Sequence, residues 1–390
     1  MSDLLLWISL ALALTITLVW WAFRRSETDS AAAPALPAQA PKKMPEAGIA
    51  PIAPVLVAAE PPGIEPIPPE LARLVWHRQA DLAPLQRNAL LAAMAGITRP
   101  PGPLLQLLSV DFVAWASTNE LSDLILAEPL VAGKLLGQVN SPLYGLRHPV
   151  TDIAQAMALL GMATVRNICV QYMLAQAFET ASAARQRVLD TLWRSSTIAS
   201  ELGGRLGKAL NLPDQGTLPT RAVLGFVGPM ATASLLPLEG LGEWLTLAPA
   251  QRAAHEQDLL GLSSGEIGGV LMTSWKLPPT LIDEVCGASR LLGLPAAQAD
   301  PATAPRLALS YLCAHLGERL ASGQLTALSD HDFMQEAAAA THHLRHYLQQ
   351  PSLHLRSYLG LLPAQRLQAA LQSPELLAAV QQMQAPMPSG

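Results

Sequence analysis

Residues 151–161 carry the clearest helix signal in the chain. Thr151 or Asp152 stands where an N-cap side chain is needed, and Gly161 stands where a helix can end. Between them, apolar residues follow the spacing i, i+3, i+4 and i+7, namely Ile153, Ala156, Met157 and Leu160. The segment is therefore predicted to be a short amphipathic helix whose two ends are both marked in the sequence.

Similar patterns recur from Glu70 onward. β-branched residues are sparse there, and no long alternation of apolar and polar residues indicates a strand. Apolar residues at three- and four-residue spacing indicate further helices over 71–75, 85–94, 121–136 and 165–172, and the third pattern is interrupted near Pro129. Asn119 or Ser122 is the expected cap before the third of these. The patterns predict an all-α protein, but they indicate no particular function.

Composition limits the partners of the chain. It has 390 residues, of which 50% are hydrophobic and 14% charged, and its formal net charge is −5. Nucleic-acid binding needs clustered Lys and Arg, so this charge disfavours a nucleic-acid partner. The turn at Gly161 is also not followed by the basic helix that a helix-turn-helix motif requires.

The scattered cysteines, Cys169, Cys286 and Cys313, are expected to be buried, reduced thiols.

The N-terminus carries a candidate membrane anchor. Leu4–Phe23 is a run of 20 residues without a charge, the length that a helix needs to cross a bilayer. Arg24 and Arg25 follow this run and Met1–Asp3 holds no basic residue, so the rest of the chain is placed in the cytoplasm. A cleaved signal peptide, which needs a basic region before the apolar run, is the alternative. A single pass through the inner (cytoplasmic) membrane is predicted.

The rest of the chain divides by composition. Residues 26–69 hold eleven of the 33 prolines, mixed with alanine, and proline both fixes φ and removes a backbone donor. The predicted organisation is an anchor over 1–25, a Pro/Ala-rich disordered linker over 26–69, a helical lead-in over 70–99, a main domain over 100–295, and a helical extension over 296–390. In that extension Leu307, Leu309, Leu312, Leu316 and Leu320 are expected core residues, and the tail is expected to fray after Leu377.

Landmarks in a fixed order give the main domain a family resemblance. They are Asn140-Ser141-Pro142-Leu143-Tyr144-Gly145, Ala156-Met157-Ala158-Leu159-Leu160-Gly161, Val165-Arg166-Asn167, Trp193-Arg194-Ser195-Ser196 and Trp275-Lys276-Leu277-Pro278. With them, the segment from about Pro100 to Leu294 resembles the HD-related output domain (HDOD), a bacterial signalling module. The resemblance implies an all-α fold of two packed lobes, the second a divergent HD-type bundle. Glu128 departs from the Asp that usually precedes Pro129.

The same resemblance raises the question of a metal site, since the family descends from metal-dependent phosphohydrolases. In those enzymes His and Asp hold divalent ions that activate water. The resemblance places Gly228-Pro229 at the His-Asp pair, and it places Ser195, Ser264 and Ala288-Ser289 at the other usual histidine positions. These side chains lack the imidazole and carboxylate groups of the family's site. No metal, no cofactor and no phosphohydrolase activity are therefore expected.

A histidine cluster near the C-terminus is a second candidate metal site. His342 and His346 are four residues apart, so a helix places both on one face, a spacing that zinc can use. No Glu follows His342 as it does in metalloprotease motifs. The favoured interpretation is an exposed or half-buried cluster without a metal. His331-Asp332 repeats the letters of the HD motif outside the resembling region, and we interpret it as chance.

Together these features predict a membrane-tethered, non-enzymatic signalling output or scaffold protein. Its partners are the membrane, through Leu4–Phe23, and an unidentified cytoplasmic signalling protein, with homo-oligomerisation left open. The candidate contact residues are Asn140, Ser141, Tyr144, Gly145, Gly161 and Arg166, although Ser141 and Tyr144 can equally serve only to shape the turn. The alternative is a cryptic cyclic-dinucleotide-binding or phosphohydrolase-related protein, and a transcription-linked DNA binder is a third reading.

Overall fold

The computed structural model describes residues 66–108, 117–140, 146, 148–212, 216–300, 302–332, 339–349 and 371–384. The chain divides into two units, Met1–Gly63 and Ile64–Gly390, and all described residues belong to the second. The predicted anchor Leu4–Phe23 lies outside the described residues. Within the described part, no single helix is both long and apolar enough to cross a membrane. Ile153–Leu160 and Met162–Ala177 meet that test of length and composition together, as a pair bent by 111°.

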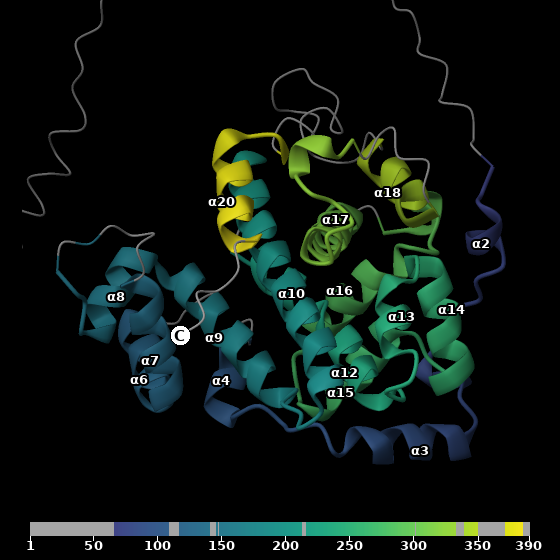
Figure 1. Cartoon of the computed structure of the whole chain (residues 1–390), viewed down its shortest axis with the longest axis horizontal. Coiled ribbons are helices and arrows are strands. Elements are labelled where there is room, and N and C mark those ends of the chain that lie inside the picture. Colours follow the sequence, from purple (N-terminus) through teal and green to yellow (C-terminus); the bar gives the residue numbers. More distant parts are fainter. Residues whose placement is uncertain are drawn as a thin grey trace, which may run out of the picture. The chain divides into compact units, whose positions relative to one another are not determined.

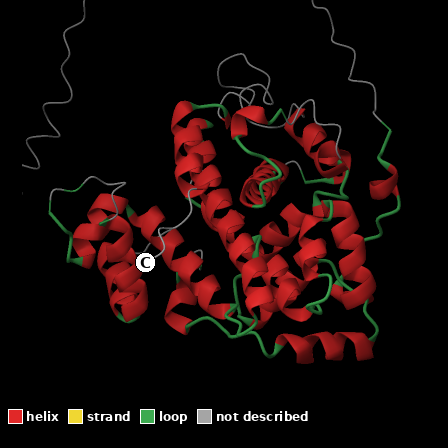
Figure 2. Cartoon of the chain, viewed as in Figure 1, coloured by secondary structure: helices red, strands yellow, loops and turns green. Residues whose placement is uncertain are grey.

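Every regular element among the described residues is helical, which confirms the all-α prediction (Figure 2). The N-terminal elements are α2 (Pro69–Ala72), η1 (Gln79–Asp81), α3 (Pro84–Met94) and α4 (Gly102–Gln106). They are followed by α6 (Thr118–Leu126), α7 (Pro129–Val139), α8 (Ile153–Leu160) and α9 (Met162–Ala177). Next come α10 (Ala183–Ala209), α11 (Leu218–Leu224), α12 (Val227–Leu235), α13 (Leu241–Thr246), α14 (Pro249–Leu260), α15 (Ser264–Ser274) and α16 (Pro279–Arg290). The last elements are η3 (Ala296–Gln298), α17 (Ala304–Ala321), η4 (Leu328–Asp330), α18 (Ala339–Gln349) and α20 (Pro374–Gln384).

Helices α6, α7 and α8 pack on one another and on α9, and they form the first lobe (Figure 1). In α8 the Asp152 side chain caps the helix by accepting a hydrogen bond from the Gln155 backbone nitrogen at 3.1 Å. The four residues predicted to share one face of α8 are all buried. Gly161 ends the helix with φ +79°, a backbone conformation that favours glycine. The helix is therefore the one that its sequence predicted.

Helix α10 connects the two lobes, because it contacts α9 and also packs against α11, α12, α17 and α20 (Figure 1). Its most extensive partner is α17. The two helices approach closely at Gly317, where a Cβ atom would lie 2.6 Å from the carbonyl oxygen of Ser195 and 3.0 Å from the nitrogen of Ala199. Glycine is therefore required for this spacing.

The residues after 295 complete the second lobe. Helix α17 packs against α10, α11 and α16, and α18 packs against α17, α14 and η3. The predicted core residues of α17 are buried, except for the half-buried Leu307. Helix α20 packs against α10, continues to Gln384 and buries Val380, so the fraying predicted after Leu377 is wrong. A contact partner inside the same unit orders this part of the chain.

An N-terminal strap, which we define as residues 66–82, is held by one buried amide. The side chain of Gln257 on α14 accepts a hydrogen bond from the His77 backbone nitrogen at 2.7 Å and donates one to the Val75 carbonyl at 2.8 Å. Trp76 lies between these two residues and packs closely on Gly293. A Cβ atom on Gly293 would overlap the indole nitrogen of Trp76. The strap is thereby fixed to the second lobe.

Two local predictions are tested directly by the structure. The cysteines are buried and unpaired, as predicted, and burial raises the pKa of Cys169 to about 12.

The predicted cap of α6 is wrong, because neither Asn119 nor Ser122 precedes the helix. Ser117 is the N-cap, and it forms a capping box in which its backbone nitrogen donates to the Glu120 carboxylate at 2.7 Å.

The α10–α17 crossing gives a stability prediction. Gly317→Ala is expected to lower the free energy of unfolding by about 1–3 kcal/mol, because the new methyl group overlaps the α10 backbone. Gly137→Ala in α7 is the matched control. No atom lies within 4 Å of a Cβ there, so the same substitution is expected to raise stability by about 0.5–1 kcal/mol. Urea denaturation of both variants measures the two effects, and equal effects would contradict the close crossing.

Candidate functional site

Asn140 holds the two ends of the signature turn together. Its side-chain nitrogen donates to the carbonyl oxygens of Leu136 and Val150, at 2.9 and 2.8 Å, and its side-chain oxygen accepts from the Val150 nitrogen at 2.7 Å. The amide therefore ties the end of α7 to the residues just before α8. This geometry gives Asn140 a structural role. Ser141, Tyr144 and Gly145 lie outside the described residues.

Arg166 has a similar structural role in α9. Its side chain is buried, and its Nε donates to the carbonyl oxygen of Leu107, just after α4, at 2.7 Å. Burial lowers the pKa of this guanidinium to about 10, so it stays charged at neutral pH. Gly161, by contrast, is exposed at the junction of α8 and α9. Of the predicted contact residues that the structure describes, Gly161 and Asn140 are therefore the exposed ones.

Two of the positions that the resemblance assigns to the phosphohydrolase ligands, Gly228 and Ser264, come together where α12 crosses α15. A Cβ atom on Gly228 would overlap the carbonyl oxygen of Ser264, and a Cβ on Gly268 would lie 2.9 Å from the Cα of Gly228. The two backbones are thus in direct contact. A histidine side chain at position 228 has no space unless the two helices separate.

Helix α16 closes the same region from another side. A Cβ atom on Gly265 would overlap the hydroxyl of Ser289, whose Oγ donates to the carbonyl of Cys286 at 2.8 Å. Ser195 lies earlier in the chain, in α10, where its Oγ donates to the carbonyl of Thr191 at 2.8 Å. The structure therefore places Gly228, Ser264 and Ser289 together, while Ser195 contacts Thr191 within α10 and Gly317 of α17.

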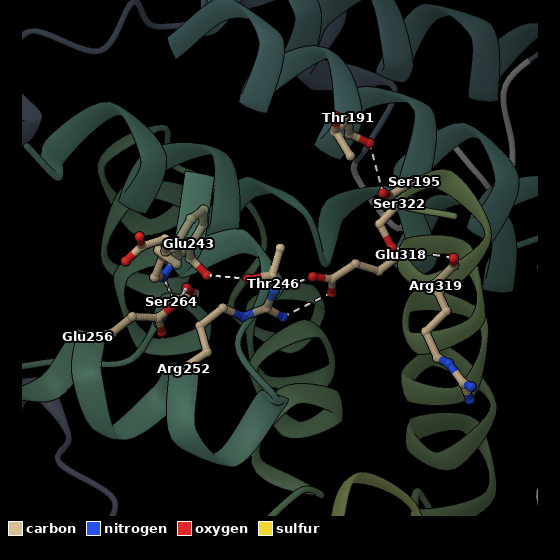
Figure 3. A network of polar contacts seen from close by, with 11 residues as sticks. Thr191, Ser195, Glu243, Thr246, Arg252, Glu256, Ser264, Glu318, Arg319 and Ser322 are labelled. Carbon is tan, nitrogen blue, oxygen red and sulfur yellow. Dashed lines mark hydrogen bonds and ion pairs between the residues drawn. The ribbon is translucent and has the colours of Figure 1, made fainter. Parts of the chain in front are cut away.

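A buried carboxylate lies beside this region. Glu256 on α14 accepts hydrogen bonds from the Ser264 backbone nitrogen at 2.6 Å, the Ser264 hydroxyl, and the Trp244 indole nitrogen at 2.9 Å (Figure 3). Burial raises the pKa of Glu256, against the opposing effects of Arg252 and of these hydrogen bonds. The carboxylate is occupied by protein donors, so it fixes the start of α15. No sequence motif marks this residue.

Arg252, one turn before Glu256, links α14 to α17. It forms a bidentate ion pair with Glu318, and its guanidinium lies 5.7 Å from the ring centroid of Trp244 (Figure 3). Burial alone would lower the pKa of Arg252, but the carboxylates of Glu318 and Glu256 raise it above its ordinary value. The bidentate geometry offsets part of the cost of removing both charges from water, and it fixes the orientation of the two helices.

The C-terminal histidines form a tight, mostly buried group on α18. The ring centroids of His342 and His343 are 5.0 Å apart, and those of His342 and His346 are 5.2 Å apart. His342 and His343 are 3% and 5% exposed, so the prediction of an exposed or half-buried cluster is wrong for both, whereas His346 is half-buried. Burial, together with the two neighbouring histidines, lowers the pKa of His343 to about 4.

Two further histidines lie in or beside α17, where His315 is half-buried and His331 is buried. Burial and nearby cations lower the pKa of His315 to about 3 and that of His331 to about 4. The Nε2 atom of His315 has no hydrogen-bond partner. Within the described part of the chain, the α18 cluster is nevertheless the only group of three or more metal-ligating side chains that lie together.

Part of this helical arrangement matches a known family model. Residues 104–289 match the family model of the HDOD domain. This segment is therefore similar to the HDOD domain, in agreement with the resemblance inferred from the landmarks. The match ends before α17, although α17 supplies much of the second lobe's core. A comparison with curated proteins gave no match.

Solved structures support the same fold. An HDOD domain protein of unknown function from Geobacter sulfurreducens is 18% identical, with a TM-score of 0.53 over 76% of this chain and 98% of that one. A candidate signal transduction protein from Marinobacter aquaeolei is 18% identical, with a TM-score of 0.50 over 77% and 66%. A candidate phosphohydrolase from Shewanella amazonensis is 19% identical, but its TM-score of 0.47 carries no argument. At these identities the likeness shows the fold alone.

The role of Asn140 can be tested by substitution. Asn140→Ala is expected to lower the free energy of unfolding by about 1–3 kcal/mol, because it removes three hydrogen bonds that hold the turn. Asn140→Asp keeps the acceptor for the Val150 nitrogen and is expected to cost less. Chemical denaturation of both variants gives the comparison. Wild-type stability in Asn140→Ala would show that the amide does not hold the turn.

Three histidines predict a pH dependence of stability. His315, His331 and His343 have lowered pKa values in the folded chain, so the unfolded chain takes up protons that the folded chain does not. The contribution of these neutral histidines to the free energy of unfolding is fully present above the ordinary pKa of 6.5 and is lost as the pH falls toward about 4. In that range the free energy of unfolding is expected to fall by about 1.4 kcal/mol per pH unit for each histidine.

Denaturation from pH 7 to pH 4.5, in the presence of a chelator, measures this slope. His315→Gln is expected to give a shallower curve than the wild type. His148→Gln is the control, because His148 is exposed, and its curve is expected to run parallel to that of the wild type. Parallel curves for all three proteins would contradict a neutral His315.

Proposed function

We propose that this chain is a non-catalytic, membrane-tethered signalling protein whose HDOD domain acts through protein contacts. The observation that carries the proposal is the direct backbone contact between α12 and α15 at Gly228. HDOD domains are related to the HD phosphohydrolases, and in this chain the corresponding position is filled by two packed helices. A metal-activated water has no place between them.

The polar groups next to that contact support the same reading. The Ser264 nitrogen and hydroxyl both donate to Glu256, and the Ser289 hydroxyl donates to a backbone carbonyl. Arg252 satisfies Glu318 instead of facing an open cavity. Because these polar groups form hydrogen bonds and ion pairs with one another, they stabilise the lobe. We therefore infer that they are not available as ligands for a phosphate or a metal ion.

The first lobe is the better candidate for partner contact. Three large apolar side chains are exposed there, namely Leu126 on α6, Leu146 after the signature turn, and Leu159 on α8. We take these three side chains as the candidate contact surface, because interaction sites commonly expose apolar side chains. The internal bonds of Asn140 and Arg166 would then hold this lobe in the shape that a partner recognises.

The proposed tether supplies the location. Leu4–Phe23 is long and apolar enough to anchor the chain in a bilayer, and the proline-rich residues 26–69 would act as the spacer. Tethering raises the local concentration of a bound partner at the membrane. A contact of modest affinity would therefore be sufficient for signal output.

The proposed lack of catalysis is tested with the wild-type protein and with a variant that carries the family's His-Asp pair. The full-length wild-type protein, with Mn²⁺ or Fe²⁺ added, is expected not to hydrolyse cyclic dinucleotides. The double variant Gly228→His, Pro229→Asp is expected to remain inactive and to lose about 3 kcal/mol or more of stability, because the imidazole overlaps α15. Gly242→His is the control, since a Cβ there meets no atom within 4 Å.

The outcomes separate the two main readings. Hydrolysis by the wild-type protein would refute the non-catalytic proposal. Saturable binding of a cyclic dinucleotide without hydrolysis would favour the alternative of a nucleotide-binding protein. A folded double variant that gains activity would show that α12 and α15 separate readily, contrary to the contact at Gly228.

The contact surface has its own test. Full-length protein crosslinked in its native membrane is expected to be joined to a cytoplasmic protein, and Leu159→Glu on α8 is expected to reduce that product at least fivefold. Leu238→Glu is the matched control, because Leu238 is equally exposed but lies in the second lobe. Equal loss with both variants, or with neither, would contradict contact through the first lobe.

A further inference from the structure

The histidine group on α18 has the composition of a metal site. The nitrogen atoms that His342, His343 and His346 offer all lie within 4.8 Å of one another. The three rings belong to one helix, which packs against α14, α17 and η3. Their relative positions are therefore set by a single rigid element and do not depend on a flexible loop.

The spacing is close to what a tetrahedral ion requires. With metal–nitrogen bonds of about 2.0–2.1 Å, two ligand nitrogens of a tetrahedral zinc are about 3.3 Å apart. The observed limit of 4.8 Å leaves an adjustment of about 1.5 Å at most, which rotation about the side-chain χ angles can supply. Helical spacing of four residues between His342 and His346 is one that zinc sites use.

The ligand chemistry of imidazole also favours a zinc-class ion. Imidazole suits zinc, copper, nickel and iron, whereas magnesium and calcium require oxygen ligands. The neutral imidazole is the form of histidine that binds a metal. No carboxylate or thiol belongs to the group, so three neutral nitrogens would leave the charge of the ion uncompensated and a fourth position available.

We propose that α18 carries a site for a zinc-class divalent ion, held by one imidazole nitrogen each from His342, His343 and His346. The fourth position would take water or a small anion. The site is separate from the HDOD domain match, which ends at residue 289, and it does not depend on the proposed signalling role. A bound ion would fix α18 against α14 and α17, and so would stabilise the second lobe.

Zinc binding by the full-length protein tests the proposal. After dialysis against a chelator, titration with Zn²⁺ followed by calorimetry is expected to show saturable binding of one ion per chain and a rise in Tm. His346→Ala removes the least buried ligand and is expected to weaken binding at least tenfold, as is His342→Ala. His148→Ala is the control, because His148 is an exposed histidine of the first lobe, and it is expected to bind as the wild type does.

A spectroscopic measurement keeps the test decisive if His342→Ala does not fold. Co²⁺ bound to the wild-type protein is expected to give visible absorption bands of four-coordinate cobalt without a thiolate charge-transfer band, and these bands should be lost in His346→Ala. Absence of saturable zinc binding by the wild type would overturn the proposal. So would wild-type affinity in both histidine variants, or a cobalt spectrum that indicates thiolate or purely oxygen ligands.

Discussion

The direct contact between the α12 and α15 backbones is the constraint on which the second lobe depends. It exists because Gly228 and Gly268 have no side chains at the point where the helices cross. The close approach places the Ser264 carbonyl against Gly228, and the Ser264 nitrogen and hydroxyl then face Glu256. A polar network that includes Trp244, Arg252 and Glu318 follows from that arrangement (Figure 3).

This contact belongs to a wider set of interactions that hold the second lobe. Packing at Gly228, the buried carboxylate of Glu256 and the bidentate ion pair between Arg252 and Glu318 all contribute. The first lobe is independently fixed by Asn140 and Arg166, whose side chains bind backbone carbonyls across the chain. The shape of both lobes is thus maintained by interactions among the chain's own residues.

Local features were predictable from the sequence, and long-range ones were not. The ends and buried face of α8 follow from Asp152, Gly161 and the apolar spacing, because each acts within a few residues. The Ser117–Glu120 capping box could also have been predicted, because serine precedes glutamate by three residues. The sequence analysis chose the nearby Asn119 or Ser122 instead. The burial of His342 and the place of α17 depend on partners far along the chain, which no local pattern encodes. The signature residues predicted a family, whereas the roles of Asn140 and Arg166 became clear only from their hydrogen-bond partners.

The most direct test of the account is an experimental electron-density map of the full-length protein grown with Mn²⁺. Anomalous scattering locates the ion without reference to any assumed ligand. The account predicts no anomalous peak within coordination distance of Gly228, Ser264 or Ser289, and it predicts backbone contact between α12 and α15 in the density. A manganese peak between those helices, or helices separated by a cavity at that point, would contradict it.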